Sequence, residues 1–334
     1  MNKIIKIAVD AMGGDGSPKK VIDGIHHHFK NNKNSFYQIF GDKDKILPHI
    51  KNDLSDSSFE IIHTLDIVKG TDSPLEGAKR GKNTSMWLAI QNVKEKKSDV
   101  VISAGNTGAL LVISKLNLNM IENIDKPALS ALWPNKTGMS VVLDLGANIE
   151  CSPKNLIDFS IMGSSLFKSL YPNDNAKVAL LNIGSEELKG NEIIKETYQQ
   201  LNKRDNHDFE FKGYIEGNQL MNGDVNVIVA DGFTGNVALK TAEGTANFIT
   251  GELKKAMTGS IIGKFSSLLN ISNLKRFKAR LDPRLYNGAI FIGLDHPVIK
   301  SHGGTDYIGF SNSLSVCTKT VSGDLIEKIR NNIN

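Results

Sequence analysis

Residues 6–25, KIAVDAMGGDGSPKKVIDGI, decide the fold, because this short segment holds a strand, a glycine-rich turn and a helix start. The strand is the largely apolar run at 4–9. Gly13, Gly14 and Gly16 permit positive φ and a close approach of the backbone to a ligand. We expect Ser17 to cap the helix, with Pro18 at its first position. Such a helix start offers free N–H groups to a phosphate or a carboxylate.

The turn matches neither of the common nucleotide-binding motifs. It departs from G-x-G-x-x-G where Pro18 follows Ser17, and no G-x-x-x-x-G-K-[ST] occurs in the chain. A nicotinamide dehydrogenase and a P-loop NTPase are therefore disfavoured. Asp10 and Asp15 would repel a bare phosphate, so from residue chemistry alone we expect these two carboxylates to brace the turn.

The composition is that of an ordinary globular protein. With 334 residues, 40% hydrophobic and 23% charged, the chain can bury a normal core as one large α/β unit or as two lobes. A net charge of +4, from 40 basic and 36 acidic residues, argues against nucleic acid as a partner. Cys151 and Cys317 lack a C-x-x-C partner, which indicates a reducing compartment without disulfides or structural zinc. We find no signal peptide or membrane span and expect a cytoplasmic protein.

Apolar runs alternate with helical patterns along the chain, which is typical of a mostly parallel sheet. The expected strands are 36–40, 59–62, 100–103, 140–145, 178–183 and 225–230. The expected helices are 75–93, 107–116, 156–170, 190–201 and 237–249. Ser73-Pro74 and Ser152-Pro153 repeat the Ser17-Pro18 pair, so three helices are expected to begin with a serine cap and a proline.

Four loops rich in glycine and asparagine follow predicted strands and precede predicted helices. They are SAGNTGA at 103–109, DLGAN at 144–148, NIGSEELKGN at 182–191 and DGFTGN at 231–236. In an open parallel sheet such loops share one edge, where ligands bind, so we expect them to converge. Asparagine side chains and free backbone amides hold anions and carbonyl oxygens without supplying a proton. Lys189 is the one cation in these loops. A single asparagine is more often a turn residue, but four such loops together favour a site.

The same motifs resemble those of a known family. DAMGGDGSP, SAGNTGAL, KPALSALWP, LDLGAN, LNIGSEELKGN, DGFTGNVALKTAEG and YNGAIFIGLDHPVIKSHGG, in this order between about residues 5 and 320, are similar to the acyl-acyl carrier protein:phosphate acyltransferases, the PlsX family. The resemblance implies a three-layer, Rossmann-like α/β/α fold with a mostly parallel sheet, related to isocitrate dehydrogenase and phosphotransacetylase. It also implies a homodimer, and a single acyltransferase domain over residues 1–334. The implied reaction makes acyl phosphate from inorganic phosphate and acyl-loaded acyl carrier protein, for phospholipid synthesis.

By motif, the resemblance assigns the chemistry to Lys189, which neutralises the phosphate or the oxyanion, and to Asn236, which donates to the thioester carbonyl. The further candidates for phosphate and substrate binding are Asp10, Gly13, Gly14, Asn106, Thr107, Gly108, Asn148, Gly184, Gly235 and His302. His302 either lines the site or caps the last helix. Two positions depart from the family pattern: Lys126 stands where arginine is common, and Tyr214 replaces an asparagine. Direct attack by phosphate on an activated thioester needs no metal or cofactor, and none is expected.

Cys151 is the candidate for a covalent route, because it precedes the helix start at Ser152-Pro153. We favour a buried structural cysteine, since no histidine lies near it in sequence. His26, His27 and His28 are consecutive on a helix and cannot form a metal pair at i and i+4, so a solvated helix end is expected there.

Residues 250–282 are expected to form an amphipathic helical hairpin that protrudes from the domain. Its apolar side includes Met257, Ile261, Ile262 and Phe265, and seven lysines and arginines between 254 and 280 make it locally basic. This pattern fits an intersubunit packing surface or a peripheral membrane foot on anionic lipid. The resemblance supports both, with attachment to the inner face of the cell membrane and a downstream membrane glycerol-3-phosphate acyltransferase as the next enzyme.

Two alternatives stay open on the sequence. A phosphotransacetylase-like enzyme acting on a coenzyme A thioester could use the same fold and anion loops. A noncatalytic phosphate-binding or membrane scaffold is a second reading, and Lys189 and Asn236 argue against it. For the acidic carrier protein the candidate docking residues are Lys79, Arg80 and Lys82, or the basic residues at 275–280.

Overall fold

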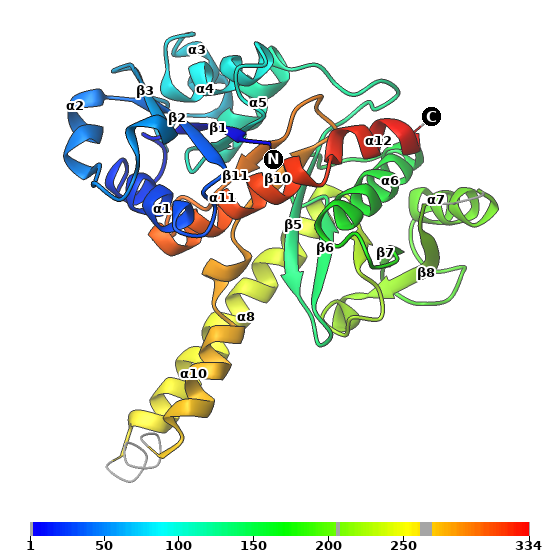
Figure 1. Ribbon diagram of the computed structural model, residues 1–334. Coiled ribbons are helices and arrows are strands. Elements are labelled where there is room, and N and C mark those ends of the chain that lie inside the picture. Colours follow the sequence, from blue (N-terminus) through cyan, green and yellow to red (C-terminus); the bar gives the residue numbers. More distant parts are fainter. Residues whose placement is uncertain (1–2, 205–207, 261–268, 334) are drawn as a thin grey trace.

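A single sheet of eleven strands runs through the protein, in the order β3-β2-β1-β4-β11-β10-β5-β6-β9-β7-β8 (Figure 1). The computed structural model describes residues 3–204, 208–260 and 269–333. The strands are β1 (Ile5–Asp10), β2 (Ser35–Gly41), β3 (Phe59–His63), β4 (Val100–Ser103), β5 (Ala128–Pro134), β6 (Met139–Leu143), β7 (Lys177–Asn182), β8 (Glu210–Glu216), β9 (Val227–Val229), β10 (Ala289–Ile292) and β11 (Val298–Lys300).

The strands fall into two parallel sets that run in opposite directions. β3, β2, β1, β4 and β11 are parallel to one another, and so are β6, β9, β7 and β8. Between the two sets, β10 is antiparallel to both β11 and β5, and β5 is antiparallel to β6. The carboxyl ends of the two sets therefore lie at opposite edges of the sheet. All seven expected strands are present, including the first one at 4–9, whereas β5, β8, β10 and β11 were not predicted from the sequence.

Helices cover both faces of the sheet. They are α1 (Lys19–Phe29), α2 (Lys43–Ile46), α3 (Pro74–Lys79), α4 (Ser85–Lys94), α5 (Thr107–Asn117), α6 (Pro153–Leu170), α7 (Glu192–Lys203), α8 (Gly232–Thr258), α10 (Ile271–Arg280), α11 (Tyr307–Ser322) and α12 (Leu325–Ile333). Successive residues of β1 point into different cores: Ile7 and Val9 pack with α1, α6 and α11, while Ala8 packs with α4 and α5. The predicted three-layer α/β/α arrangement is thus confirmed.

The expected helix starts are only partly correct. Ser73 and Ser152 cap α3 and α6 as predicted, each within a capping box. Ser17 does not cap α1, because its hydroxyl donates to the carbonyl oxygen of Gly13 at 2.6 Å instead. The expected helix over 75–93 is two helices, α3 and α4. The histidine prediction is also wrong: His28 is buried on α1 and its Nδ1 lies 2.6 Å from the hydroxyl of Tyr37.

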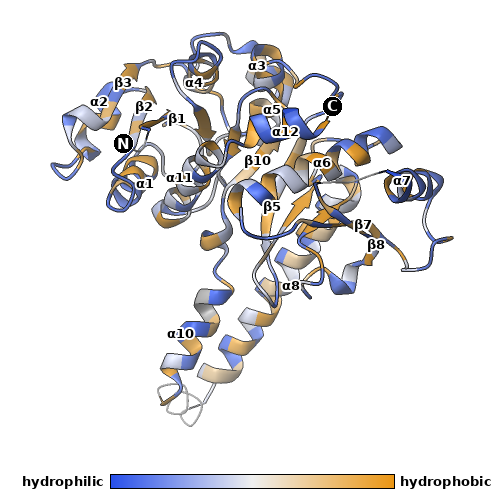
Figure 2. Cartoon of the chain, turned by 45° about the vertical axis from the view of Figure 1, so that its right-hand side comes forward, coloured by the Kyte–Doolittle hydropathy of each residue, from blue (hydrophilic) through white to orange (hydrophobic). Residues whose placement is uncertain are grey.

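The helices α8 and α10 leave the body of the protein side by side, as both views of the chain show (Figures 1 and 2). Their base is fixed where the Arg280 guanidinium donates to the carbonyl oxygens of Asn135 and Lys136, at 3.4 and 3.3 Å. Of the apolar residues expected at the tip, Ile261, Ile262 and Phe265 lie outside the described residues. No helix in the described part of the chain is long and apolar enough to cross a membrane.

Candidate functional site

Asp10 organises the first group of predicted site residues, at the carboxyl ends of β1, β4 and β11. Its buried carboxylate accepts hydrogen bonds from the hydroxyls of Ser103 at 2.6 Å and Ser85 at 2.7 Å, and from the amide of Met12 at 3.2 Å. Burial raises the pKa of Asp10, and these hydrogen bonds partly oppose that rise. The carboxylate therefore braces the turn, as residue chemistry suggested, and its contact with substrate stays a prediction.

Gly13 and Gly14 let this turn pack directly against the loop after β4. A β-carbon on Gly13 would come within 2.5 Å of the amide nitrogen of Gly105. Gly14 has a φ of 82°, and a β-carbon there would lie 2.8 Å from the carbonyl oxygen of Ala104. The two loops consequently meet backbone to backbone, which only glycine allows.

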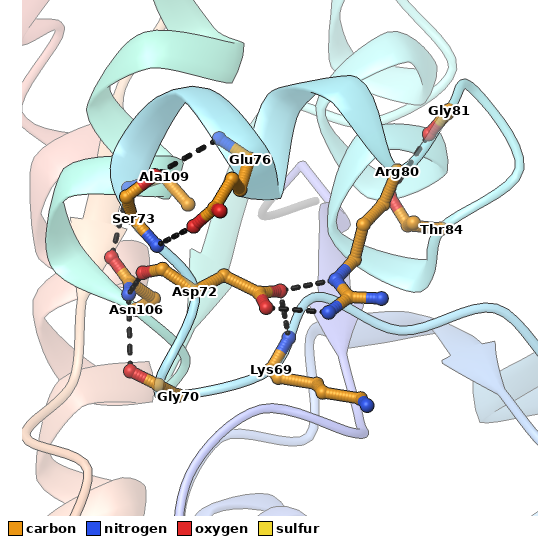
Figure 3. A network of polar contacts seen from close by, with 10 residues as sticks. All are labelled: Lys69, Gly70, Asp72, Ser73, Glu76, Arg80, Gly81, Thr84, Asn106 and Ala109. Carbon is orange, nitrogen blue, oxygen red and sulfur yellow. Dashed lines mark hydrogen bonds and ion pairs between the residues drawn. The ribbon is translucent and has the colours of Figure 1, made fainter.

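Asn106 holds a third loop in place (Figure 3). Its Oδ1 caps α5 by accepting from the amide of Ala109 at 2.9 Å, and its Nδ2 donates to the carbonyl oxygens of Asp72 at 2.7 Å and Gly70 at 3.1 Å. The Asp72 carboxylate pairs with the Arg80 guanidinium. The whole side chain of Asn106 is thus engaged within the protein, so its predicted role toward substrate requires that it exchange one of these contacts.

The two neighbours of Asn106 differ in exposure and packing. Thr107 is exposed at the first turn of α5, and a β-carbon on Gly108 would come within 2.5 Å of Pro74. Gly108 is thus required by the packing of α5 against α3, and a contact of either residue with substrate stays a prediction.

Two lysines that the sequence reasoning missed lie in this first group. Lys20 on α1 and Lys300 at the end of β11 are each only 8% exposed. The Lys20 ammonium donates to the carbonyl oxygen of Gly303 at 2.6 Å, and the Lys300 ammonium donates to that of Ser301. Burial, and next the charge of Lys20, lower the pKa of Lys300 to about 8. Two features of the sequence could have identified these lysines: Lys20 lies on the buried face of α1, and Lys300 ends an apolar strand.

His302 follows Lys300 in the chain and is exposed. Its ring Nδ1 accepts from the amide of Gly304 at 3.2 Å, so it neither caps the last helix nor binds a carboxylate in the described part of the chain. The pKa of His302 is lowered, first by burial and next by the charge of Lys300. The charge of Glu243 opposes this shift, whereas the charges of Lys240 and Lys20 add to it. Lys240 and Glu243 lie one and two turns beyond Asn236 on α8. Charges on α8 therefore act on a residue of the first group.

Asp144 organises the second group, at the carboxyl ends of β6, β9 and β7. Its buried carboxylate accepts from the amides of Leu129, Ala147 and Asn148 and from the side chain of Asn148, at 2.7–3.1 Å. Asn148 also donates to the carbonyl oxygen of Pro127 at 2.7 Å. Asn148 thus shapes the 144–148 loop, and a direct contact with substrate stays a prediction.

The first turn of α8 packs onto this loop. A β-carbon on Gly235 would come within 1.9 Å of the carbonyl oxygen of Asp144, and one on Gly232 within 2.5 Å of that of Asn148. The contact brings the exposed side chain of Asn236 beside Gly146, where a β-carbon would lie 3.6 Å from the Cγ of Asn236. The side-chain amide of Asn236 makes no hydrogen bond in the described part of the chain.

Lys189 lies in the loop after β7, fixed by Asn182. The side chain of Asn182 donates to the carbonyl oxygens of Gly184 and Lys189, both at 3.1 Å. Gly184 is buried against the lysine, since a β-carbon there would lie 3.0 Å from the Cγ of Lys189. The ammonium is exposed and forms no ion pair with the residues that the structure describes. It is therefore available to a bound anion.

Exposed apolar side chains follow or flank each loop of the second group. They are Ile149, Ile183, Leu188, Phe233 and Val237, which we call the apolar ring, and each is between 50% and 85% exposed. Ile149 follows Asn148, Leu188 precedes Lys189, and Phe233 and Val237 lie one turn apart on α8. An apolar surface of this kind is typical of a binding site for an apolar group or a partner.

The four loops follow strands of both parallel sets, so they form two groups by the strands that position them. Ala147 of the 144–148 loop packs against the hydrophobic cluster that contains Ala109 and Leu110 of α5, and a single site that joins the two groups stays a prediction. The 103–109 loop belongs to the first group, and the 144–148, 182–191 and 231–236 loops belong to the second. The reason is the pair of strands β10 and β5, whose antiparallel pairing reverses the strand direction between β11 and β6. The long helix α8 begins in the second group, and the charges of its Lys240 and Glu243 act on His302 of the first.

Cys151 has the environment of a structural thiol. It is buried, and its pKa is raised to about 11, first by burial and then by the charges of Asp144 and Asp231. A thiol with that pKa is almost wholly protonated near neutral pH and is a poor nucleophile. Among the described residues, no three or more His, Cys, Asp or Glu side chains form a group that could hold a metal ion.

The chain matches a family model described as "Fatty acid synthesis protein" over residues 5–328. It is 87% identical over 333 residues to the phosphate acyltransferase of Pelagibacter ubique (strain HTCC1062), covering 100% of both chains. It is 41% identical to that of Maricaulis maris and 42% identical to that of Rhodospirillum rubrum, covering 100% of this chain and 96% and 95% of theirs.

Two solved structures share the fold. EutD phosphotransacetylase from Staphylococcus aureus matches with a TM-score of 0.61 at 15% identity, covering 95% of this chain and 94% of that one. A phosphotransacetylase from Streptococcus pyogenes matches with a TM-score of 0.61 at 15% identity, covering 98% and 95%. The predicted relation to the phosphotransacetylase fold is confirmed; at these identities the likeness extends to the fold alone.

Proposed function

The chain belongs to the fatty acid synthesis protein family, the PlsX phosphate acyltransferases, and on that premise we propose that it transfers an acyl group from acyl-acyl carrier protein to inorganic phosphate. A phosphate oxygen attacks the thioester carbonyl carbon, a tetrahedral oxyanion forms, and the carbon–sulfur bond breaks to release the carrier thiolate. The products are acyl phosphate and free carrier protein, and acyl phosphate then serves phospholipid synthesis.

The exposed apolar side chains of the apolar ring, which flank Asn236 and Lys189 along the chain, are the observation that carries this proposal. Burying a long acyl chain against these side chains removes apolar surface from water, at about 25 cal/mol per Å². An acetyl group could gain little from the same surface. The ring thus supports a fatty acyl substrate whose reacting carbonyl binds at Asn236 and Lys189.

Within this site, Asn236 and Lys189 have separate roles. The Asn236 amide donates to the thioester carbonyl and strengthens its hydrogen bond as the oxyanion forms. Lys189 supplies positive charge to the phosphate or to the oxyanion. No acyl-enzyme is needed, because the thioester is already activated and the two reactants have only to be held together. The protonated thiol of Cys151 supports direct attack.

The protruding helices support two further parts of the proposal. Exposed apolar residues on α8 and α10, including Phe248, Ile249 and Phe277, suit pairing with a second copy of the chain as a homodimer. The basic and apolar residues toward the tip suit a cytoplasmic protein that binds an anionic membrane surface peripherally. There it would deliver acyl phosphate to a membrane glycerol-3-phosphate acyltransferase.

The membrane role is tested with Ile261→Glu. We expect this variant to lose binding to anionic vesicles and to keep an intact dimer. Unchanged vesicle binding would contradict the membrane role.

The carrier is tested by turnover. Purified protein is given inorganic phosphate with either acyl-acyl carrier protein or acyl-coenzyme A, and acyl phosphate is trapped as hydroxamate. We expect preferential turnover of the carrier-protein substrate. Preference for coenzyme A would make the protein phosphotransacetylase-like, and no turnover with either substrate in a folded dimer would favour a noncatalytic scaffold.

The apolar ring is tested by chain length. Leu188→Asn and Ile183→Asn are expected to raise the KM for a long acyl thioester several-fold more than for a short one. Leu65→Asn, which changes a comparably exposed apolar residue in the loop after β3, is the matched control. Equal effects on long and short chains would remove the ring from substrate binding, and a change of oligomeric state would assign it to subunit contact.

A further inference from the structure

Lys20 and Lys300 carry buried ammonium groups that have no role in the reaction as described so far. In the described part of the chain neither forms an ion pair, although both side chains are 8% exposed. Each ammonium has three N–H donors, and the structure gives each one acceptor, the carbonyl oxygen of Gly303 or of Ser301. Several donors are therefore left for a ligand.

The nearby carboxylates do not balance these charges. Asp10 accepts three hydrogen bonds, from two serine hydroxyls and a backbone amide, and burial raises its pKa, which disfavours its charged form. Asp15 acts on Lys20 only at a distance and is exposed. The repulsion from Lys20 affects Lys300 more than the attraction from Asp10 does. Two like charges buried together without a counter-ion are costly, so the arrangement is completed by an anion.

The backbone around these lysines is built for close approach. A β-carbon on Gly14 would lie 3.0 Å from the Lys20 ammonium nitrogen and 3.0 Å from the carbonyl oxygen of Gly303. Gly14 itself and His302 are exposed, so the loops that flank the two ammonium groups are open to solvent. A small anion can thus reach the Lys20 ammonium group, which a bulkier residue at position 14 would cover.

We propose that Lys20 and Lys300 form the cationic half of an inorganic phosphate subsite at the carboxyl ends of β1, β4 and β11. The identity of the anion rests on the proposed function. The charges of Glu243 and Lys240 on α8 act on His302, which follows Lys300 by two residues. Direct attack requires this phosphate to reach the thioester carbonyl that Asn236 binds, so the subsite has to adjoin the second group. The phosphodiester of a carrier's prosthetic arm has similar chemistry and is the other source that the test must distinguish.

The test uses Lys20→Met and Lys300→Met in the full-length protein, with Lys19→Met as the matched control on α1. Lys19 is exposed and pairs with Asp23, so its replacement changes the net charge equally without touching the subsite. Binding of orthophosphate is measured by calorimetry, and the KM values for phosphate and for acyl-acyl carrier protein are measured separately. Lys20→Arg, which keeps the charge, reports whether charge alone suffices.

Loss of a charge-assisted hydrogen bond weakens binding about tenfold to a hundredfold. We expect that loss in the phosphate affinity and phosphate KM of both methionine variants, with the KM for acyl-acyl carrier protein within about twofold of wild type. Lys20→Arg should retain most of the affinity. Phosphate values within about twofold of wild type in both folded variants would overturn the proposal, as would a rise confined to the carrier-protein KM.

The outcomes separate this subsite from the proposed reaction. In one outcome, wild-type protein binds phosphate but turns over no acyl thioester, and the Lys300→Met variant does not bind phosphate. The subsite is then supported and the proposed reaction is wrong. If wild-type protein turns over acyl-acyl carrier protein and the variants keep their phosphate KM, the reaction stands and the subsite is wrong. Should Lys300→Met fail to fold, Lys20→Met gives the same two readouts.

Discussion

Gly235 lies so close to Asp144 that a β-carbon would come within 1.9 Å of the carbonyl oxygen of Asp144. This contact seats the first turn of α8 on the 144–148 loop and so fixes the position of Asn236. The glycine is required by packing, whatever its contact with substrate.

Gly235→Ala should therefore displace the start of α8 and lower kcat by an order of magnitude or more, because a misplacement of about 1 Å can cost about a hundredfold. The hydroxamate assay measures the loss. Gly244→Ala is the control on the same helix, where a β-carbon meets open space, and it should keep activity and gain up to about 1 kcal/mol of stability. Equal activity in the two variants would show that Asn236 is not positioned by this contact.

Asn236→Ala is expected to lower kcat by about 10²–10³, the range for one oxyanion donor. Lys189→Ala should lower kcat/KM as well, since it removes the exposed ammonium of the second group. Circular dichroism checks that both variants are folded, and Lys203→Ala is a control for the loss of an exposed lysine. Near-normal turnover in folded Lys189→Ala and Asn236→Ala would refute their assignment.

Cys151→Ala is expected to retain near-wild-type turnover, because burial and two nearby carboxylates hold the thiol protonated with a pKa of about 11. Its alkylation by iodoacetamide should stay slow at neutral pH. Loss of activity by more than about tenfold in a folded variant, or an acyl group found on Cys151 by mass spectrometry, would instead support a covalent route.

Lys300 links stability to pH. Its pKa falls from 10.5 in the unfolded chain to about 8 in the folded protein, so the unfolded state holds the proton more tightly. Stability should thus rise as pH increases from about 8 to 10.5, and Lys300→Met should remove this rise while stabilising the protein at pH 7 by up to about 3 kcal/mol. Urea unfolding at pH 7 and 10 measures both effects. A Lys300→Met variant less stable than Lys19→Met at pH 7 would contradict the unfavourable burial of this charge.

The same group predicts how phosphate binding depends on pH. The groups that face Lys300 are Lys20, Asp10 and His302. Because Lys300 carries its charge only below its pKa, affinity for phosphate should fall as pH rises through about 8, and Lys300→Met should lose that step.

The sequence alone was sufficient to predict the α/β fold class and to identify most loops of the candidate site. Strands such as 36–40 and 100–103 are continuous apolar runs, because they are buried on both faces of a parallel region. The hairpin at α8 and α10 was visible in its basic and apolar residues. By contrast, β5 includes Trp133 and Pro134 and has no clear period, and β10 and β11 are too short to recognise without their neighbours.

The arrangement of the loops could not be predicted for the same reason. The direction of β6 relative to β4 depends on β10 and β11, an antiparallel pair from residues 289–300 that inserts between β4 and β5, two strands much earlier in the chain. The subsite at Lys20 was equally hidden, since its ammonium meets the carbonyl oxygen of Gly303, 283 residues away. Local sequence patterns carry no information on such pairs.

The central claim is that phosphate itself attacks the thioester. It is tested most directly by the rate at which acyl-acyl carrier protein releases its free thiol as the phosphate concentration is varied. We expect no release without phosphate, and with phosphate a saturable rate equal to the rate of acyl phosphate formation. A burst or steady release of thiol in the absence of phosphate would contradict the claim and indicate an acyl-enzyme or simple hydrolysis.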